Sequence, residues 1–230
     1  MTIAMLIPAA GVGSRMQADR PKQYLQLADK TVLEHTAAKL LALPQTTRLF
    51  LALSPTDPYF DQLPLAADPR ICRVDGGAER ADSVLAALSA IDAAEYPWTL
   101  VHDAARPLVQ TADIEKLLQA CLDCGVGGIL ASPVRDTMKR GSVSEQGQSL
   151  VEHTVERRQL WHALTPQLFP TLLLRDALSR ALAAGVAITD EASAMEWAGL
   201  PVQLIPGRAD NLKITQPEDL ALARFYLEQA

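Results

Sequence analysis

The chain has 230 residues, 49% of them hydrophobic and 21% charged, and its formal net charge is -6 at neutral pH. This length allows one α/β domain with a sizeable core, and the composition is that of an ordinary soluble globular protein. The acidic balance excludes a general nucleic-acid-binding protein, which needs a basic surface. The absence of an apolar run of roughly 18 residues excludes a membrane-spanning protein.

Short apolar runs alternate with amphipathic helical stretches along the chain. Strands are predicted over residues 3–9, 48–53, 71–75, 99–103, 127–134 and 201–205. Helices are predicted over residues 31–43, 82–91, 112–122, 171–185 and 217–230. This alternation predicts an α/β fold with a Rossmann-like, mostly parallel sheet flanked by helices, and we assign residues 1–230 to a single domain.

Three of the predicted helices carry end signals. The first opens with a T-x-x-E capping box at Thr31, the fourth closes at Gly185, and the last starts with Pro217. The second is expected to be capped near Asp82 or Ser83.

Residues 134–160 depart from this pattern. Two extended segments flank the polar, glycine-containing stretch RGSVSEQGQ, and they have too little apolar surface to pack on their own domain. We therefore predict a protruding β-hairpin arm that needs a partner.

The N-terminus and the cysteines indicate the cytoplasm. The stretch MTIAMLIPAAG lacks the basic flank and small-residue cleavage site of a signal peptide. Cys72, Cys121 and Cys124 are an odd number, which favours thiols over disulfides. Cys121 and Cys124 form a CxxC late in a helix ending at Gly125, whereas a redox pair usually opens a helix, so we expect an ordinary core or surface role.

Three interpretations compete for the glycine-bearing loop from Gly11 to Lys22. A dinucleotide fingerprint needs glycine where Met16 stands, and a Walker A loop needs its G-K-[ST] there, so both fail. The remaining interpretation is a loop whose backbone N–H groups face phosphate oxygens at the end of the first strand, with Arg15 and Lys22 supplying charge. A plain strand-to-helix turn with solvated basic residues is the alternative.

Two further strand ends offer candidate contacts. Gly76 and Gly77 follow the third strand, where paired glycines are either a ligand contact or a plain turn. Asp103 follows the fourth, where it orients a substrate hydroxyl, helps to hold Mg²⁺, or is simply a turn or helix-start residue. The four histidines show no metal-binding spacing and no G-x-S-x-G elbow is present, so we assign the histidines no chemistry.

Taken together, the motifs resemble the 2-C-methyl-D-erythritol 4-phosphate cytidylyltransferase family of the non-mevalonate isoprenoid pathway. The resemblance extends from residue 8 to residue 215 and rests on PAAGVGSRM, PKQYL, DGGAERADSV, VHDAARP, PVRDTMKR, HTVERRQLWHALTPQ, TDEASAMEWAG and GRADNLKIT. It implies a nucleotidyltransferase fold, a cytoplasmic homodimer joined through the 134–160 arm, and transfer of a cytidylyl group from CTP to methylerythritol phosphate. Because the last predicted helix reaches Ala230, we expect no second enzyme fused to this one.

The resemblance also implies roles for individual residues. Transition-state stabilisation falls to Arg15 and Lys22, with Lys213 and Arg157 completing the catalytic set. Nucleotide binding falls to Ala9, Ala10, Gly11, Gly77 and Ser83. The second substrate is expected among Asp103, Arg106, Thr137 and Lys213, with Arg157 and Thr165 arriving on the arm of the other subunit. Mg²⁺ is expected to bridge the CTP phosphates, without metal-ligating residues of its own. Ala78 stands where family members often carry an acid.

Two alternatives stay open at this point. One is a related nucleotidyltransferase acting on another sugar or alditol phosphate, against which HTVERRQLWHALTP speaks. The other is a nucleotide-binding module without catalysis, against which the presence of Arg15, Lys22 and Lys213 speaks.

Overall fold

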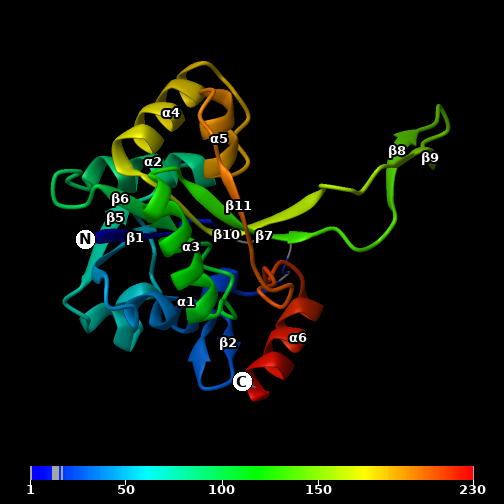
Figure 1. The fold of residues 1–230 in the computed structure, drawn as a ribbon. Coiled ribbons are helices and arrows are strands. Elements are labelled where there is room, and N and C mark those ends of the chain that lie inside the picture. The colour runs from blue at the N-terminus through cyan, green and yellow to red at the C-terminus, as the bar shows by residue number, and fades with distance from the viewer. Residues whose placement is uncertain (1, 12–15, 17, 230) are drawn as a thin grey trace.

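A seven-stranded sheet forms the centre of the computed structural model, which describes residues 2–11, 16 and 18–229 (Figure 1). The strand order is β11-β7-β10-β6-β1-β4-β5. The strands are β1 (Ile3–Pro8), β4 (Thr46–Leu53), β5 (Ile71–Asp75), β6 (Trp98–Val101), β7 (Gly128–Pro133), β10 (Trp161–Pro170) and β11 (Gln203–Pro206). All run parallel except β10, which pairs antiparallel with both β6 and β7. The predicted mostly parallel sheet is confirmed.

β10 is the one strand of this sheet that the sequence pattern did not predict. Pro166 lies inside it, and a proline normally argues against a central strand because it cannot donate to the ladder. The pairing of β10 with β7 is irregular between Ala163 and Gln167, so the proline falls where the ladder is interrupted. Before the interruption β10 pairs with β7 alone, and from Gln167 onward it also pairs with β6.

Helices cover both faces of the sheet (Figure 1). Successive side chains of β1 point to opposite faces and pack against different helices. Ile3, Met5 and Ile7 pack in one core cluster with α1 (Val32–Leu41) and α3 (Thr111–Cys124). Ala4 and Leu6 point to the opposite face. There they pack with α2 (Arg80–Ala90), α4 (Thr171–Ala183) and α5 (Glu191–Trp197). Both faces are therefore buried, as a parallel sheet requires.

A smaller cluster lies beside the main layers. It joins α6 (Pro217–Glu228) to the short hairpin of β2 (Gln26–Leu27) and β3 (Lys30–Thr31) through Leu27, Val32, Ala105, Ile214 and Ala223. Short 3-10 turns complete the described chain: η2 (Lys22–Tyr24), η3 (Phe60–Gln62) and η4 (Pro64–Ala67).

Most helix ends follow the sequence signals. Thr31 caps α1 in a capping box with Glu34, and Gly125, with a φ of 72°, ends α3. The predicted start of α2 near Asp82 is wrong, because the Asp82 carboxylate instead accepts a hydrogen bond from the Glu79 backbone N–H one turn earlier and α2 begins at Arg80. Helix α5 was not predicted at all.

The cysteines are all free thiols. Cys121 is buried on the inner face of α3, and burial, followed by the nearby Cys124, raises its pKa to about 12. A thiol with so high a pKa is a poor nucleophile.

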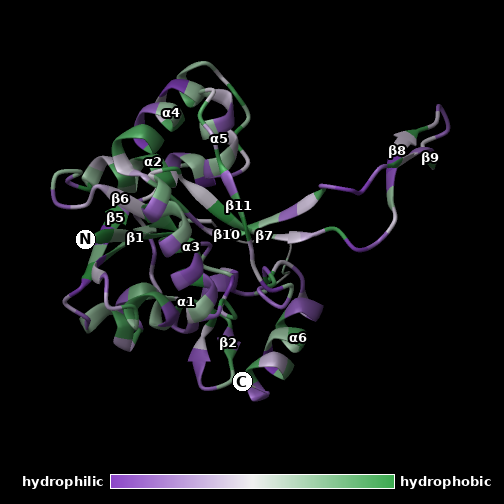
Figure 2. Cartoon of the chain, in the orientation of Figure 1, coloured by the Kyte–Doolittle hydropathy of each residue, from purple (hydrophilic) through white to green (hydrophobic). Residues whose placement is uncertain are grey.

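Residues beyond β7 leave the body of the molecule as a hairpin. Strands β8 (Met138–Val143) and β9 (Ser149–Val155) pair antiparallel with each other in a two-stranded sheet of their own. Figures 1 and 2 show this hairpin extending away from the helices, with few strongly hydrophobic residues along it. The predicted hairpin is confirmed.

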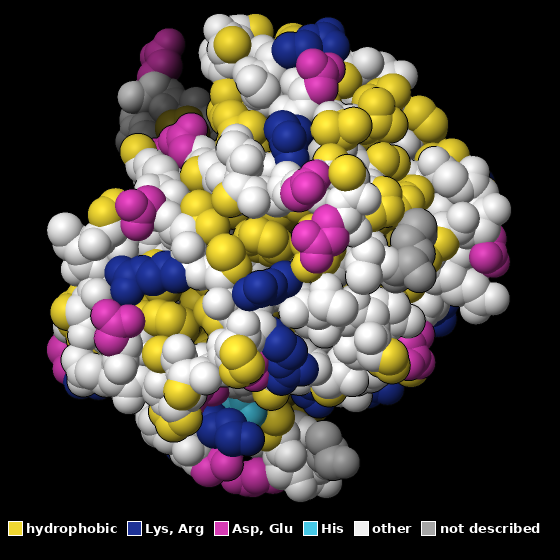
Figure 3. Space-filling model, turned by 90° about the vertical axis from the view of Figure 1, so that its left-hand side faces the viewer, with side chains coloured by type: hydrophobic (Ala, Val, Ile, Leu, Met, Phe, Trp, Pro, Cys, Tyr) yellow, Lys and Arg dark blue, Asp and Glu magenta, His cyan; other side chains and the backbone are white. Residues whose placement is uncertain are grey.

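Across the described residues, we find no helix with the length and apolar character needed to span a membrane. On the face turned away from the hairpin, Lys and Arg side chains alternate with Asp and Glu side chains and form no continuous basic surface (Figure 3).

Candidate active site

The candidate site lies at the carboxyl ends of β1 and β6. β1 pairs with β4 on one side and with β6 on the other, so the chain connections diverge at this point of the sheet. Ligands of open α/β sheets bind at such switch points. The residues that follow β1 and β6 here are Ala9 to Gly11 and His102 to Asp103.

The first loop is held by a glutamine. Buried Gln23 donates hydrogen bonds from Nε2 to the carbonyl oxygens of Ala9, at 2.7 Å, and Gly11, at 3.1 Å. These bonds fix the backbone of the predicted nucleotide loop on its inner side. Gln23 was not singled out in the sequence, although it lies in the PKQYL motif; Arg15 lies outside the described residues.

The second predicted nucleotide loop meets the first at Gly76. A Cβ atom on Gly76 would lie 2.5 Å from the Ala10 Cβ and 2.9 Å from the Ser83 hydroxyl oxygen, so only glycine fits. The Ser83 hydroxyl accepts from the Gly77 backbone N–H at 3.1 Å and donates to the Glu79 carbonyl at 3.1 Å. Ala10, Gly77 and Ser83 are thus brought together, and Ser83 supports the glycine loop.

Asp103 is surrounded by positive charge. Its carboxylate lies 2.9 Å from Arg80 Nε, 2.9 Å from Lys213 Nζ and 3.5 Å from Arg106 Nε. Burial by itself would raise the pKa of Asp103, but Arg80, Lys213 and Arg106 outweigh it and hold the pKa well below its usual range. Asp103 is therefore a fixed negative charge that orders three cations.

Arg80 is a residue of the site that the sequence analysis did not single out. Its Nη1 and Nη2 atoms lie 2.6 and 3.1 Å from the carboxylate oxygens of Glu191, which is buried at the start of α5. Burial opposes the charge of Arg80, but Glu191 and Asp103 raise its pKa. The arginine in the DGGAERADSV motif was the available signal.

Thr165 belongs to the site of its own chain. The prediction that it arrives on the arm of another subunit is wrong, because Thr165 lies within β10, is buried, and accepts a hydrogen bond from the Asp103 backbone N–H at 3.0 Å. Its hydroxyl also lies 2.9 Å from His102 Nδ1. His102, to which we assigned no chemistry, is therefore part of the site.

Asp103, its three cationic partners and Thr165 line a cavity of about 210 Å³. Three cationic side chains face it, together with the carboxylates of Asp103 and Asp190. The lining residues are Arg80, Asp103, Arg106, Ala163, Leu164, Thr165, Gln167, Thr189, Asp190 and Lys213. A cavity with this combination suits a small ligand that carries both phosphate and hydroxyl groups.

Lys22 reaches the same region from the first loop. Its Nζ donates to the carbonyl oxygen of Ile214 at 2.9 Å, next to Lys213. The carbonyl group that holds the predicted catalytic Lys22 thus belongs to the residue after Lys213, the other predicted catalytic lysine, whose own Nζ lies 2.9 Å from Asp103.

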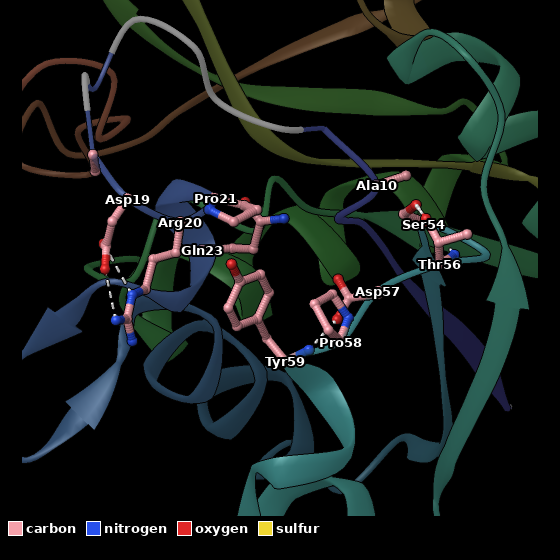
Figure 4. A pocket seen from close by; sticks show the side chains of 11 residues that line it. Ala10, Asp19, Arg20, Pro21, Gln23, Ser54, Thr56, Asp57, Pro58 and Tyr59 are labelled. Atoms are coloured by element: carbon pink, nitrogen blue, oxygen red, sulfur yellow. Dashed lines mark hydrogen bonds and ion pairs between the residues drawn. The ribbon is translucent and has the colours of Figure 1, made fainter.

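A second cavity, of about 390 Å³, is lined by side chains that include Ala10, Ser54 and Tyr59 (Figure 4). Of the predicted site residues that the structure describes, only Ala10 lines it. Its polar side chains are largely bonded to the protein: Asp19 pairs with Arg20 at 2.8 Å, and Asp57 accepts from the Tyr24 hydroxyl at 2.8 Å. The predicted substrate residues do not gather here.

Thr137 and Arg157 lie on the exposed arm and do not line the cavity of their own chain. Arg157 donates a hydrogen bond to the backbone carbonyl of Arg135.

Within the described part of the chain, no three or more His, Cys, Asp or Glu side chains are grouped so that they could hold a metal ion. The Asp103 carboxylate, the candidate raised from the sequence, is occupied by three cations and does not fit a magnesium ligand.

Comparisons with known proteins agree with this geometry. A family model described as 2-C-methyl-D-erythritol 4-phosphate cytidylyltransferase matches residues 3–229. A protein of that name from Photobacterium profundum is 60% identical over 227 residues, covering 99% of this chain and 97% of the relative. Another from Vibrio atlanticus is 59% identical over 229 residues, covering 99% and 96%.

Solved structures show the same similarity. A crystal structure of 4-diphosphocytidyl-2C-methyl-D-erythritol synthase has a TM-score of 0.83 at 38% identity, covering 98% of each chain. The crystal structure of 2-C-methyl-D-erythritol 4-phosphate cytidylyltransferase from Thermus thermophilus has a TM-score of 0.80 at 32% identity, covering 99% of this chain and 100% of that one. The chain belongs to the 2-C-methyl-D-erythritol 4-phosphate cytidylyltransferase family.

Proposed function

We propose that this chain transfers the cytidylyl group of CTP to 2-C-methyl-D-erythritol 4-phosphate, in isoprenoid precursor biosynthesis. The products are 4-diphosphocytidyl-2-C-methyl-D-erythritol and pyrophosphate. The observation that carries the proposal is the convergence of Asp103, Arg106, Thr165 and Lys213 on one cavity beside the nucleotide loop, in a member of this family.

The reaction needs positioning and charge rather than a covalent intermediate. An oxygen of the methylerythritol phosphate forms a bond to the α-phosphorus of CTP, and the bond from that phosphorus to the oxygen bridging the β-phosphate breaks. The electron pair leaves with pyrophosphate. Negative charge therefore grows around the α-phosphate, where fixed cations stabilise it most.

The residues divide between the two substrates. Ala9, Ala10, Gly11 and Gly77 offer backbone groups to the nucleotide, and Lys22, with Arg15, supplies charge at the transferring phosphate. Lys213 and Arg106 face the cavity beside Asp103 and take the second substrate. Because Asp103 keeps these cations in place, the site is ordered before a ligand arrives.

We propose that Mg²⁺ enters with CTP and is bound chiefly by its phosphate oxygens. This fits the described residues, which gather no cluster of metal-ligating side chains. The ion neutralises triphosphate charge when bound.

We also propose a cytoplasmic homodimer joined through the arm at 134–160. An isolated two-stranded hairpin is only marginally stable in water, and Val143, Leu150 and Val151 are 75%, 51% and 64% exposed on this one, which favours a partner that covers them. The predicted substrate residues Thr137 and Arg157 then act in the partner's site. The free cysteines are consistent with a reducing compartment.

The test is pyrophosphate release with each of the four nucleoside triphosphates and methylerythritol phosphate. We expect turnover with CTP and little with ATP, GTP or UTP, since close polar recognition discriminates by orders of magnitude. Turnover with other alditol phosphates instead would favour the related nucleotidyltransferase, and no turnover with any acceptor would favour a non-catalytic module.

A further inference from the structure

His102 is fully buried, and both of its ring nitrogens have a partner. Nε2 lies 3.0 Å from the carbonyl oxygen of Arg106, and Nδ1 lies 2.9 Å from the Thr165 hydroxyl. A carbonyl oxygen only accepts hydrogen bonds, so Nε2 carries a proton. Burial lowers the pKa of His102 to about 4, so the ring is neutral at neutral pH and Nδ1 is an acceptor.

This tautomer fixes the hydrogen of the Thr165 hydroxyl. Since Nδ1 of His102 has no hydrogen to donate, Thr165 donates its own to the ring. One lone pair of the same oxygen accepts from the Asp103 backbone N–H at 3.0 Å. A hydroxyl has one hydrogen and two lone pairs, so a single lone pair is left, on a residue that lines the cavity.

The surrounding bonds prevent an easy rearrangement. Asn211 Nδ2 donates to the carbonyl of Thr165 at 2.8 Å, and Arg106 Nη1 donates to the carbonyl of Asn211 at 2.6 Å. His102, Arg106, Asn211 and Thr165 thus form a closed ring of hydrogen bonds, and all four are at least nine-tenths buried. A buried ring of this kind holds the groups that it joins in fixed positions.

We propose that His102 is a positioning residue that fixes the Thr165 hydroxyl as an acceptor, so that Thr165 receives a hydrogen bond from a hydroxyl group of the alditol phosphate. The inference rests on the proposed function for the identity of that substrate. It gives the recognition a direction: the substrate hydroxyl donates, and an analogue with a methoxy or deoxy group at that position loses the contact.

Two substitutions of His102 test the hydrogen bonds of its two ring nitrogens separately. His102→Asn keeps an acceptor near the position of Nδ1, and His102→Gln keeps a donor near the position of Nε2. We expect His102→Gln and Thr165→Val to raise KM for methylerythritol phosphate about threefold to tenfold, as for one lost hydrogen bond, with kcat and KM for CTP much less affected. The conservative variants His102→Asn and Thr165→Ser keep the required acceptor or hydroxyl, so we expect each to raise KM less than His102→Gln or Thr165→Val does.

Controls distinguish this inference from a general loss of stability and from the proposed function. Thr171→Val removes a buried hydroxyl that bonds Thr99 and the Tyr96 carbonyl outside the cavity, and it is expected to leave KM unchanged. In a Thr165→Val background, His102→Gln is expected to add nothing to KM. Equal effects of the Asn and Gln variants, or an added effect in that background, overturn the inference; a wild-type enzyme that releases no pyrophosphate overturns the proposed function instead.

A measurement independent of activity covers the case in which a variant does not fold. Nitrogen-15 NMR of the wild-type chain with labelled histidine reports the tautomer of each ring. Substituting His35, His153 and His162 in turn identifies their signals, and the signal that is left belongs to His102. A neutral Nε2–H ring for His102 at neutral pH supports the inference. A neutral Nδ1–H ring or a charged ring contradicts it.

Discussion

Arg80, which lines the cavity, and Glu191 lie 111 residues apart in the chain and form a bidentate ion pair, with nitrogen–oxygen distances of 2.6 and 3.1 Å. The same guanidinium reaches Asp103 through Nε at 2.9 Å. Arg80 therefore joins the start of α5 to the end of β6.

Loss of one partner in this pair leaves a buried charge uncompensated. We expect Arg80→Met to lower the free energy of unfolding by about 3–5 kcal/mol, because Glu191 is 2% exposed. The double variant Arg80→Met, Glu191→Leu is expected to recover part of that loss. Urea unfolding measures both, and the exposed Arg73–Asp61 pair provides the control: Arg73→Met is expected to cost less than about 1 kcal/mol. A double variant less stable than the single one would contradict the prediction.

Lys22 is expected to act on the transition state. Lys22→Ala should lower kcat far more than it raises KM for CTP, at a cost of about 2–4 kcal/mol of transition-state stabilisation, and Arg15→Ala should do the same. Steady-state pyrophosphate release gives both constants, with exposed Lys30→Ala as the control. Near-normal kcat in a folded Lys22→Ala enzyme would rule the role out.

His102 makes stability depend on pH. Burial lowers its pKa from 6.5 to about 4 in the folded chain; the hydrogen bond to the Arg106 carbonyl and the charge of Asp103 oppose this shift, and the charges of Arg106 and Arg80 add to it. Between these two pH values the unfolded chain therefore binds more protons than the folded chain. The contribution of neutral His102 to the free energy of unfolding is complete above pH 6.5 and is lost as the pH falls towards 4.

The total effect is on the order of 3 kcal/mol. Urea unfolding at a series of pH values across this range gives the free energy of unfolding as a function of pH. We expect that free energy to change less with pH in His102→Asn than in the wild type, whatever the absolute stability of the variant. Asp103, whose pKa is depressed, contributes at lower pH and does not mask the difference. Parallel slopes would contradict the prediction.

Mixed dimers test whether the arm serves the partner's site. Arg157→Ala and Lys22→Ala should each be nearly inactive alone. Exchange of equal amounts makes about half the dimers mixed, and one of the two sites in each then has an intact body and an intact arm, restoring roughly a quarter of all sites. No recovery in verified mixed dimers would mean that Arg157 serves its own chain.

Gly76 should tolerate no side chain. A Cβ at 2.5 Å from Ala10 forces the two nucleotide loops apart, so Gly76→Ala should raise KM for CTP and cost about 1–3 kcal/mol of stability. The matched control is Gly141→Ala, whose nearest contact would be 3.8 Å. An unchanged KM for CTP would show that the loops need not touch.

Local signals in the sequence predicted local structure well. Thr31 and Glu34 mark the start of α1, and Gly125 marks the end of α3, because caps and left-handed glycines act within one turn of the chain. β10 was hidden because its proline is tolerated only where the ladder is interrupted, which depends on β7.

The site was predictable where its residues end strands, as Asp103 does, and not where they meet through the fold. Nothing near Arg80 in the sequence points to Glu191. Thr165 was assigned to the wrong subunit because one motif runs continuously from Arg157 on the arm into β10, which begins at Trp161. The motif contains no signal for the point at which the chain re-enters the sheet.

The base of the arm is closed. Pro133 and Trp161 are register partners in β7 and β10, and the Val134 backbone N–H donates to the carbonyl of Leu160 at 2.9 Å. In topological terms the arm is an enlarged turn between two neighbouring antiparallel strands. A tight turn in place of residues 135–159 would leave every pairing of the seven-stranded sheet intact, so the sheet that carries the cavity and the hairpin are separable parts that can change in length and sequence independently.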